Sequence, residues 1–259
     1  MSSTASNANA KAASQSGSTK IRTLDSVRVL ATGGFVPDNV VKNEDLGKLG
    51  YDADWIVQRT GIRERRHAPA DVATSDLAVA AAKNCIEQID ANPDEIDLLI
   101  VATMTPDVPI PSTACIVQEQ LGITAPAFDI NAACAGFVYA LATGMQFVHS
   151  GASQLALVIG ADKNSHIVDP ANKKTFPLFG DGAGAVLLGN RLDDTAVTTY
   201  TLGADGSGKD LLMQRAGGSR LPMTRELVGS EHQYLNMDGR SVFKWAAVSY
   251  THLTLPTKA

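Results

Sequence analysis

The sequence predicts an α/β fold, and three observations carry that prediction. Helical and strand patterns alternate regularly between residues 75 and 188. Two of the strand patterns, DLLIVATM and LALVIGA, are apolar at nearly every position, which is typical of parallel strands buried on both faces. The helix boundaries carry capping signals, with Ser75 and Ser112 at starts and Gly122 and Gly151 after ends. We therefore expect parallel strands covered by helices on each face.

The first elements are shorter. Residues 26–32 (SVRVLAT) alternate and are β-branched, which predicts a strand that stops at an exit turn, Gly33-Gly34. Two short helices are expected next, NEDLGKLG capped by Asn43 and DADWIVQRTG capped by Asp52.

The remaining predicted elements form the regular alternation. Helices are expected over Ser75–Ile89, Ser112–Leu121 and Cys134–Ser150, and strands over Ile96–Met104, Ala125–Ile130, Leu155–Ala161 and Ala183–Leu188.

The chain divides into four parts by composition. Residues 1–20 are rich in Ser, Ala and Asn and are expected to be a disordered tail. Residues 21–190 hold the alternation, and residues 191–247 are looser and Gly-rich before MDGRSVFKWA begins another helix. Residues 248–259 contain β-branched residues and a proline where that helix should continue, which indicates an aberrant or non-native end.

Bulk composition excludes several classes of function. A content of 44% hydrophobic residues supports a sizeable core, and the net charge of -5 argues against general nucleic-acid binding, which needs a basic surface. No apolar run approaches the ~18 residues of a membrane span, so no membrane partner is expected. The three cysteines are far apart and outside any CxxC pair, so we expect no metal, no disulfide and a reducing cytoplasmic location.

Cys134 is the candidate nucleophile. It falls where the predicted strand 125–130 passes into a helix, and the unpaired amides and dipole at a helix start favour a thiolate. Its neighbours in AACAG are small, which lets a thioester approach and frees amides to hold an oxyanion. The alternative, a small buried hydrophobe, is equally consistent with the spacing. Cys85 and Cys115 lie among apolar neighbours in helical patterns and are expected in the core.

Three segments together resemble one family. NAACAGFVYAL, DADWIVQRTGIRERR and FGDGAGAVLLG closely resemble β-ketoacyl-acyl-carrier-protein synthase III, over residues 27 to 245. The resemblance implies a thiolase-like fold, a layered αβαβα sandwich of two α/β halves, assembled as a homodimer. It also implies transfer of an acetyl or other short acyl group from coenzyme A to Cys134, followed by condensation with malonyl-acyl-carrier protein. Coenzyme A would be a substrate, and no cofactor is implied.

The resemblance also assigns substrate contacts. Trp55, Arg59 and Thr60 match the segment that holds the adenine and phosphates of coenzyme A, and an indole face and a guanidinium suit those groups. The alternative is a core Trp beside a solvated Arg run. Many relatives carry an Arg where DPANKKT has Lys173, so Lys173 is expected to be a weaker contact. Ile110 stands where some relatives have an aromatic residue that limits the acyl pocket.

Other motifs are assigned no chemistry. Gly180, Gly182 and Gly184 lack the GK[ST] of a phosphate loop, and close packing beside the active site explains them better. The family's His and Asn, which stabilise an enolate, have no matching motif among the five histidines. The sequence thus predicts only the nucleophile's half of the fold, a truncated second half and an inactive chain.

The sequence leaves two alternative functions open. A polyketide-priming or other thiolase-fold acyltransferase shares the cysteine and takes a different acyl donor. A non-catalytic acyl or coenzyme A binding fragment is what loss of the His and Asn would leave.

Overall fold

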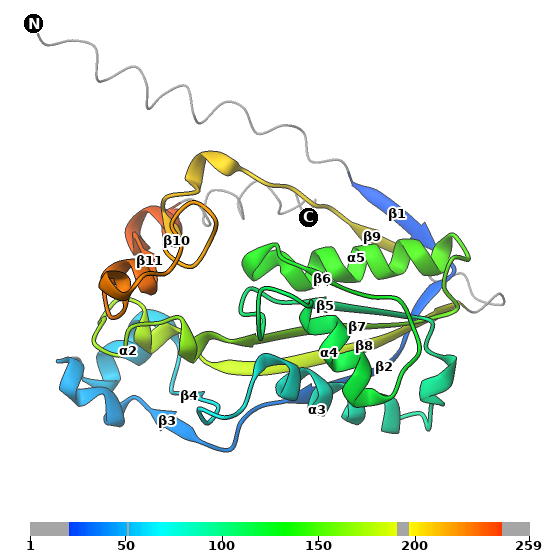
Figure 1. Ribbon diagram of the computed structural model, residues 1–259, viewed down its shortest axis with the longest axis horizontal. Helices are drawn as coiled ribbons and strands as arrows, with labels where there is room; N and C mark the ends of the chain where they lie inside the picture. The colour runs from blue at the N-terminus through cyan, green and yellow to red at the C-terminus, as the bar shows by residue number, and fades with distance from the viewer. Residues whose placement is uncertain (1–20, 51, 191–196, 245–259) are drawn as a thin grey trace, which may run out of the picture.

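The computed structural model describes residues 21–50, 52–190 and 197–244, and a five-stranded mixed sheet forms its centre (Figure 1). Across the sheet the strands follow in the order β2 (Val27–Phe35), β8 (Asp181–Asn190), β7 (Leu155–Lys163), β5 (Leu98–Ala102) and β6 (Ala127–Ile130). The expected tails, residues 1–20 and 248–259, lie outside the described residues, and the division near residue 190 stays a prediction.

The strands are not all parallel, and this corrects the expectation. β5 pairs in parallel with β6 and β7, whereas β8 is antiparallel to both of its neighbours, β7 and β2. Parallel neighbours need a crossover, usually a helix. The link between β7 and β8 holds only two 3₁₀ turns, Asn164–His166 and Phe176–Leu178, so β8 returns beside β7 in the opposite direction.

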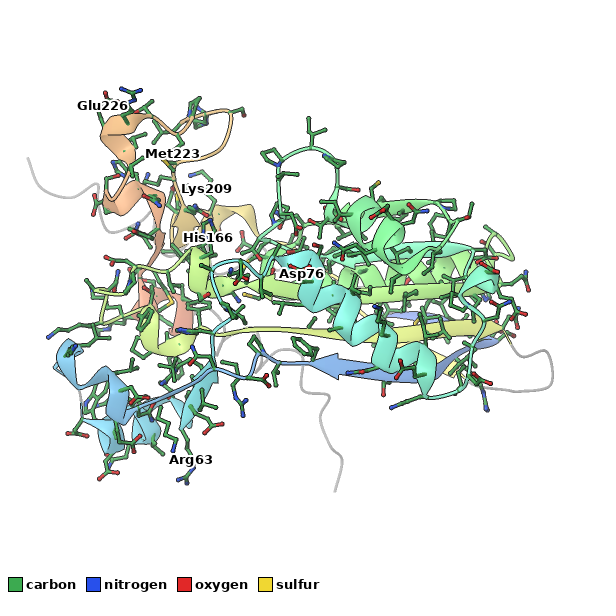
Figure 2. The ribbon with its side chains drawn as sticks, turned by 60° about the horizontal axis from the view of Figure 1, so that its bottom comes forward. Arg63, Asp76, His166, Lys209, Met223 and Glu226 are labelled. Atoms are coloured by element: carbon green, nitrogen blue, oxygen red, sulfur yellow. The ribbon has the colours of Figure 1, made fainter. Side chains whose placement is uncertain are left out.

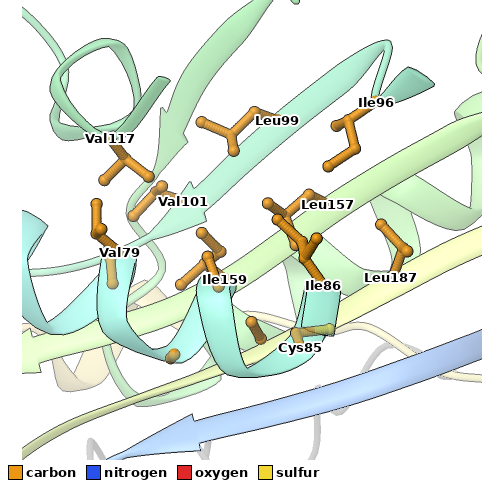
Figure 3. Close-up of a cluster of buried hydrophobic side chains, with 14 of the residues drawn as sticks. Val79, Cys85, Ile86, Ile96, Leu99, Val101, Val117, Leu157, Ile159 and Leu187 are labelled. Atoms are coloured by element: carbon orange, nitrogen blue, oxygen red, sulfur yellow. The ribbon is translucent and has the colours of Figure 1, made fainter. Parts of the chain in front are cut away.

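Helices cover both faces of this sheet, as expected. α3 (Thr74–Glu87) and α4 (Thr113–Leu121) pack on one face, and α5 (Gly136–His149) packs on the other. Each face has its own cluster of buried apolar side chains. Figure 3 shows the first cluster, where Ile86 of α3 and Val117 of α4 lie against Leu99, Leu157 and Leu187 of the sheet.

Two of the predicted helix caps are confirmed. Ser112 precedes α4 and its side chain accepts a hydrogen bond from the Cys115 amide at 3.3 Å. Asp52 precedes α2 (Ala53–Thr60) and accepts from the Trp55 amide at 2.6 Å. Both helices end at a left-handed glycine.

Two other caps were wrongly predicted. α3 begins at Thr74, and the Ser75 hydroxyl donates to Asp107 at 2.6 Å. The segment after Asn43 is a 3₁₀ helix, and the Asn43 Oδ1, the atom that would cap it, accepts a hydrogen bond from the Arg65 guanidinium at 2.7 Å. In both cases a partner distant in sequence outcompetes the local cap.

The glycine pair predicted as an exit turn lies inside a strand. β2 runs through Gly33 and Gly34 to Phe35 and pairs with β8 along this length. A Cβ on Gly33 would lie 2.3 Å from the Ala81 carbonyl and 2.4 Å from the Cys85 amide. Gly33 is therefore required because the backbone of α3 rests on the strand, not because the chain turns.

Three small strand pairs lie outside the central sheet. They are β1 (Arg22–Asp25) with β9 (Val197–Tyr200), β3 (Val40–Lys42) with β4 (Glu64–Arg66), and β10 (Leu212–Gln214) with β11 (Leu235–Met237). In Figure 1, β10 and β11 lie above α2 at one end of the sheet. Helical residues run from Gly239 to Lys244, where the described part ends, in line with the helix expected there.

Candidate active site

Cys134 opens onto a cavity at one edge of the sheet. It lies in a 3₁₀ turn, Ala133–Ala135, that links β6 to α5, and the helix itself begins at Gly136. Cys134 is exposed and lines a cavity of about 340 Å³. The reading of Cys134 as a buried hydrophobe is therefore wrong.

The strand directions explain why the cavity lies there. The carboxyl ends of parallel β5, β6 and β7 meet at one edge, and antiparallel β8 starts at the same edge, with Asp181 opposite Lys163. The cavity is lined by Ala102, Ala133, Cys134, Phe137, Gly160, Ala161, Asp162, Asn164, Gly180, Gly182 and Gly184.

The backbone before the thiol is strained. Ala133 has a φ of 46°, a left-handed conformation that disfavours any residue with a Cβ. Its amide donates to the Asn131 side chain at 3.2 Å, and the Ala135 amide donates to the Ala132 carbonyl at 3.1 Å. These bonds hold a sharp turn that leaves the thiol at the rim of the cavity.

Small residues make the cavity possible. A Cβ on Gly160 would lie 3.1 Å from the Phe137 ring, and one on Gly180 would lie 3.1 Å from the Arg66 carbonyl. Gly182 is nearly as tight, at 3.3 Å from the Phe35 carbonyl, whereas Gly184 has only ordinary contacts. The prediction of close packing beside the active site therefore holds for two of the three glycines of FGDGAGA.

Asp162 is a candidate functional residue that the sequence reasoning missed. Its Oδ1 accepts hydrogen bonds from the Met104 amide at 2.8 Å and from the hydroxyls of Thr103 and Thr105 at 3.1 and 3.4 Å. Burial raises the pKa of this carboxyl, although the three hydrogen bonds lower it. The available signal was a single carboxylate at the end of the apolar run LALVIGAD.

The other two cysteines differ from each other. Cys85 is fully buried, as expected, and burial raises the pKa of its thiol to about 11. Cys115 is exposed, which corrects the prediction that it belongs to the core. It lies on the outer side of α4, whose inner side buries Ala114 and Val117.

A second and larger cavity gathers the predicted coenzyme A contacts. Trp55, Arg59, Thr60 and Lys173 all line a cavity of about 860 Å³, within the range of roughly 300–1,000 Å³ that ligand pockets span. Trp55 is 40% exposed, and the Arg59 guanidinium lies 5.6 Å from its ring centroid. The core-Trp alternative is therefore wrong.

The opposite wall of this second cavity was not foreseen. It comes from residues 210–240 and includes Met213, Arg215, Met237 and Arg240. Met213 and Arg215 lie in the part of the sequence that appeared loose and Gly-rich, and Met237 and Arg240 lie at the start of the helix expected from MDGRSVFKWA, which was assigned no role in a site.

Ile110 lies away from both cavities within this chain. It is 88% exposed and lines neither of them. Its role in limiting an acyl pocket stays a prediction.

The described histidines contribute to neither cavity lining. His67 packs edge-on against Phe176, His149 faces Asp25 at 3.3 Å, and His166 is exposed. His232 has a buried Nδ1 without a partner. His252 lies outside the described residues.

The described ranges hold neither a metal-binding cluster nor a membrane-spanning helix. No cluster of three His, Cys, Asp or Glu side chains there is placed to hold a metal ion. No helix in the same ranges is long and apolar enough to cross a membrane.

Comparison with known proteins gives consistent results. Residues 128–206 match the family described as 3-oxoacyl-[acyl-carrier-protein (ACP)] synthase III. The β-ketoacyl-[acyl-carrier-protein] synthase III of Rhodopirellula baltica is 53% identical over 241 residues, which cover 86% of this chain and 70% of that protein.

Solved structures are similar in fold as well. The β-ketoacyl-[acyl-carrier-protein] synthase III of Thermus thermophilus has a TM-score of 0.77 at 38% identity, covering 88% of this chain and 70% of that one. The priming β-ketosynthase of the R1128 polyketide pathway has a TM-score of 0.78 at 33% identity, covering 88% and 68%. These likenesses confirm the thiolase-like fold.

Proposed function

Because the chain belongs to the β-ketoacyl-[acyl-carrier-protein] synthase III family, we propose that Cys134 is the residue that carries the acyl group. Enzymes of this family are acyltransferases that condense an acyl-coenzyme A with malonyl-acyl-carrier protein and so start fatty-acid synthesis. The observation that carries the proposal is the exposed thiol of Cys134 on a cavity of small residues, next to a strained backbone position.

The first half of the reaction is a thioester exchange. The Cys134 sulfur attacks the carbonyl carbon of the acyl-coenzyme A, a new S–C bond forms, and the bond to the coenzyme A sulfur breaks. The departing thiolate takes up a proton and leaves as free coenzyme A. In this proposal the positive end of the α5 dipole stabilises the developing oxyanion, because the Gly136 amide already donates to the Ala133 carbonyl.

The second cavity is the proposed coenzyme A site. The Trp55 ring offers a face for adenine, and Arg59 and Lys173 offer positive charge for phosphate. Thr60 contributes through position more than bonding, because its hydroxyl already donates to Ile56 at 2.7 Å and accepts from the Ile62 amide at 3.0 Å.

A homodimer is proposed as the working unit. Ile110 is 88% exposed, and Val108 and Val138 are also exposed large hydrophobic residues. Within one chain Ile110 lines neither cavity, so it can limit an acyl pocket only by contacting a second copy.

We also propose a cytoplasmic location and no resident cofactor. The support is chemical: all three cysteines are free, and Cys134 must stay reduced to accept an acyl group.

A polyketide-priming role is the second candidate. It is favoured by the similarity to the R1128 priming β-ketosynthase at 33% identity. Both candidates use the same acylation step, so they differ in the acyl donor that the cavity prefers.

The acylation half-reaction tests the proposal. Incubation with radiolabelled acetyl-coenzyme A should label the wild-type chain, and Cys134→Ser should abolish the label while the circular dichroism spectrum stays unchanged. Cys115→Ser is the matched control, because that thiol is also exposed but lines neither cavity. Reversible binding without label would favour the binding fragment, and label retained in Cys134→Ser would remove the mechanism.

A further inference from the structure

Phe137 is the bulkiest apolar side chain in the wall of the Cys134 cavity. Among the described residues that line this cavity it is the single aromatic one, and most of the others are glycine or alanine. It lies three positions after Cys134, where the 3₁₀ turn passes into α5. Side chains three positions apart on such a turn share one face, so the Phe137 ring lies on the side that bears the reactive thiol.

The floor beneath the ring is a row of small residues that crosses the sheet. Ala102 of β5 pairs with Gly160 of β7, and Gly160 pairs with Gly184 of β8. Residues directly opposite in neighbouring strands point to the same face of a sheet. A Cβ on Gly160 would lie 3.1 Å from the Phe137 ring, so α5 covers this face. The row lies near the end of β7 that leads to His166, which Figure 2 labels.

The floor has a filled part and an open part. At Gly160 the Phe137 ring occupies the space that a side chain would take. At Gly184 the nearest atom to an added Cβ is the Gly33 carbonyl oxygen, at 3.9 Å, so a methyl group would fit there without a clash. Both glycines line the cavity. The cavity thus continues along the row to Gly184, and the ring stands over the residue between its two ends.

An acyl chain on Cys134 needs an apolar surface to lie on. Asp162 and Asn164 make one part of the lining polar, whereas the row presents only alanine and glycine. We propose that Phe137 limits the acyl group carried by Cys134 to a short chain, because a longer chain that follows the row meets the ring above Gly160. The inference rests on the proposed function, since it names the acyl donors that the same site accepts.

This limit is separate from the one proposed for Ile110. Ile110 lines neither cavity within one chain, so its effect requires a second copy. Phe137 acts within one chain, because the ring and its floor both belong to the cavity described for this chain.

Loading of Cys134 with donors of increasing length tests the limit. Intact-protein mass spectrometry on the full chain would give initial acylation rates at subsaturating acetyl-, butyryl-, hexanoyl- and octanoyl-coenzyme A. The wild-type rate should fall steeply beyond butyryl. Phe137→Ala should raise the ratio of the hexanoyl rate to the acetyl rate by about 10-fold or more, since one methylene in an apolar pocket is worth roughly that factor. Phe137→Leu should raise it less, and it carries the test if the Ala variant does not fold.

Two further variants separate chain-length selection from a merely structural role. Phe147→Ala is the matched control, because Phe147 belongs to the same helix and lines neither cavity, and its ratios should equal those of wild type. Adding Gly184→Ala to Phe137→Ala should reverse the gain with hexanoyl-coenzyme A, because the new methyl group occupies the open part of the floor.

The outcomes distinguish this inference from the proposed function. Unchanged ratios in both Phe137 variants, an equal fall of all four rates, or a wild type that takes octanoyl as fast as acetyl would overturn the limit. Acetyl loading of Cys134 in the same experiments would still support the proposed function. No loading of the wild type by any of the four donors would overturn both.

Discussion

Position 134 gains its chemistry from its neighbours. Ala133 is held at a φ of 46°, and the residues around the thiol have little side-chain volume, so a substrate can reach the sulfur. The residue type alone does not confer this property, since the same chain has a buried thiol at Cys85 and an exposed one at Cys115.

The three thiols should differ in their reactivity. The pKa of about 11 leaves Cys85 about one thousandth ionised at pH 8, and no solvent reaches it. Iodoacetamide at pH 8 should therefore modify Cys134 and Cys115 and spare Cys85, as read by peptide mass spectrometry. In urea all three should react, which is the control. Modification of Cys85 in the native protein at the rate of Cys115 would contradict the burial.

Asp162 should affect stability in a pH-dependent way. Because burial raises its pKa in the folded protein, the carboxyl binds its proton more tightly when folded, and its contribution is lost as the pH rises through the folded value. Asp162→Asn keeps an acceptor for Thr103, Met104 and Thr105 and should be more stable than wild type at pH 7, with the gain shrinking toward pH 4.

Asp162→Ala is the matched comparison. It leaves three donors without their acceptor and should lower the free energy of unfolding by about 1–3 kcal/mol in urea titrations. An Asn variant no more stable than the Ala variant at pH 7 would show that the hydrogen bonds to this side chain do not stabilise the fold.

At the scale of elements, the direction of β8 determines which of its residues reach the active site. Its antiparallel course brings its first residues, Asp181 and Gly182, to the edge where β5, β6 and β7 end. Asp181 then joins three segments, since it accepts from the Ala68 amide and from the amide and hydroxyl of Ser165, at 2.6–2.7 Å. The start of β8, whose Gly182 lines the cavity, is thereby fixed to the loop before α3.

The contact between α3 and β2 is a sharp test of the packing. Gly33→Ala would place a Cβ 2.3 Å from the Ala81 carbonyl, so α3 must move, and the free energy of unfolding should fall by about 2–3 kcal/mol. Gly34→Ala is the control, because its nearest contact is 3.8 Å away, and it should stay within about 1 kcal/mol of wild type. Equal effects at both positions would contradict the packing.

The sequence predicted the positions of helices and strands better than it predicted strand directions and hydrogen-bond partners. Ser112 and Asp52 were identifiable as caps because a cap depends on residues three positions away. Ser75 and Asn43 were misassigned because their partners, Asp107 and Arg65, are distant in sequence. The direction of β8 was missed for the same reason, since apolar runs look alike in parallel and antiparallel strands.

At the scale of the whole molecule, the site consists of two cavities that are lined by different parts of the sequence. The nucleophile of the first cavity could be predicted from one motif, whereas the wall with Arg215 and Arg240 could not, because only the fold brings it into the cavity of Trp55. The prediction for Cys115 failed for a similar reason. The apolar pattern of α4 does not reveal which side of this helix another element covers.

Self-association is the prediction at this scale. Sedimentation should show a dimer, and Ile110→Asp, which places a charge on the exposed apolar surface, should shift it toward monomer. Ile89→Asp is the control, because Ile89 is also an exposed large hydrophobic residue, at 45%, and lies two residues after the end of α3. A monomer in the wild-type chain would remove the dimer proposal.

The central claim is that Cys134 alone accepts the acyl group. Peptide mass spectrometry after incubation with acetyl-coenzyme A measures it directly, because each of the three cysteines can be read separately. The account predicts a hydroxylamine-sensitive acetyl group on Cys134 and none on Cys115 or Cys85. Acetyl groups on Cys115 at a comparable level, or none on Cys134 at saturating donor, would contradict it.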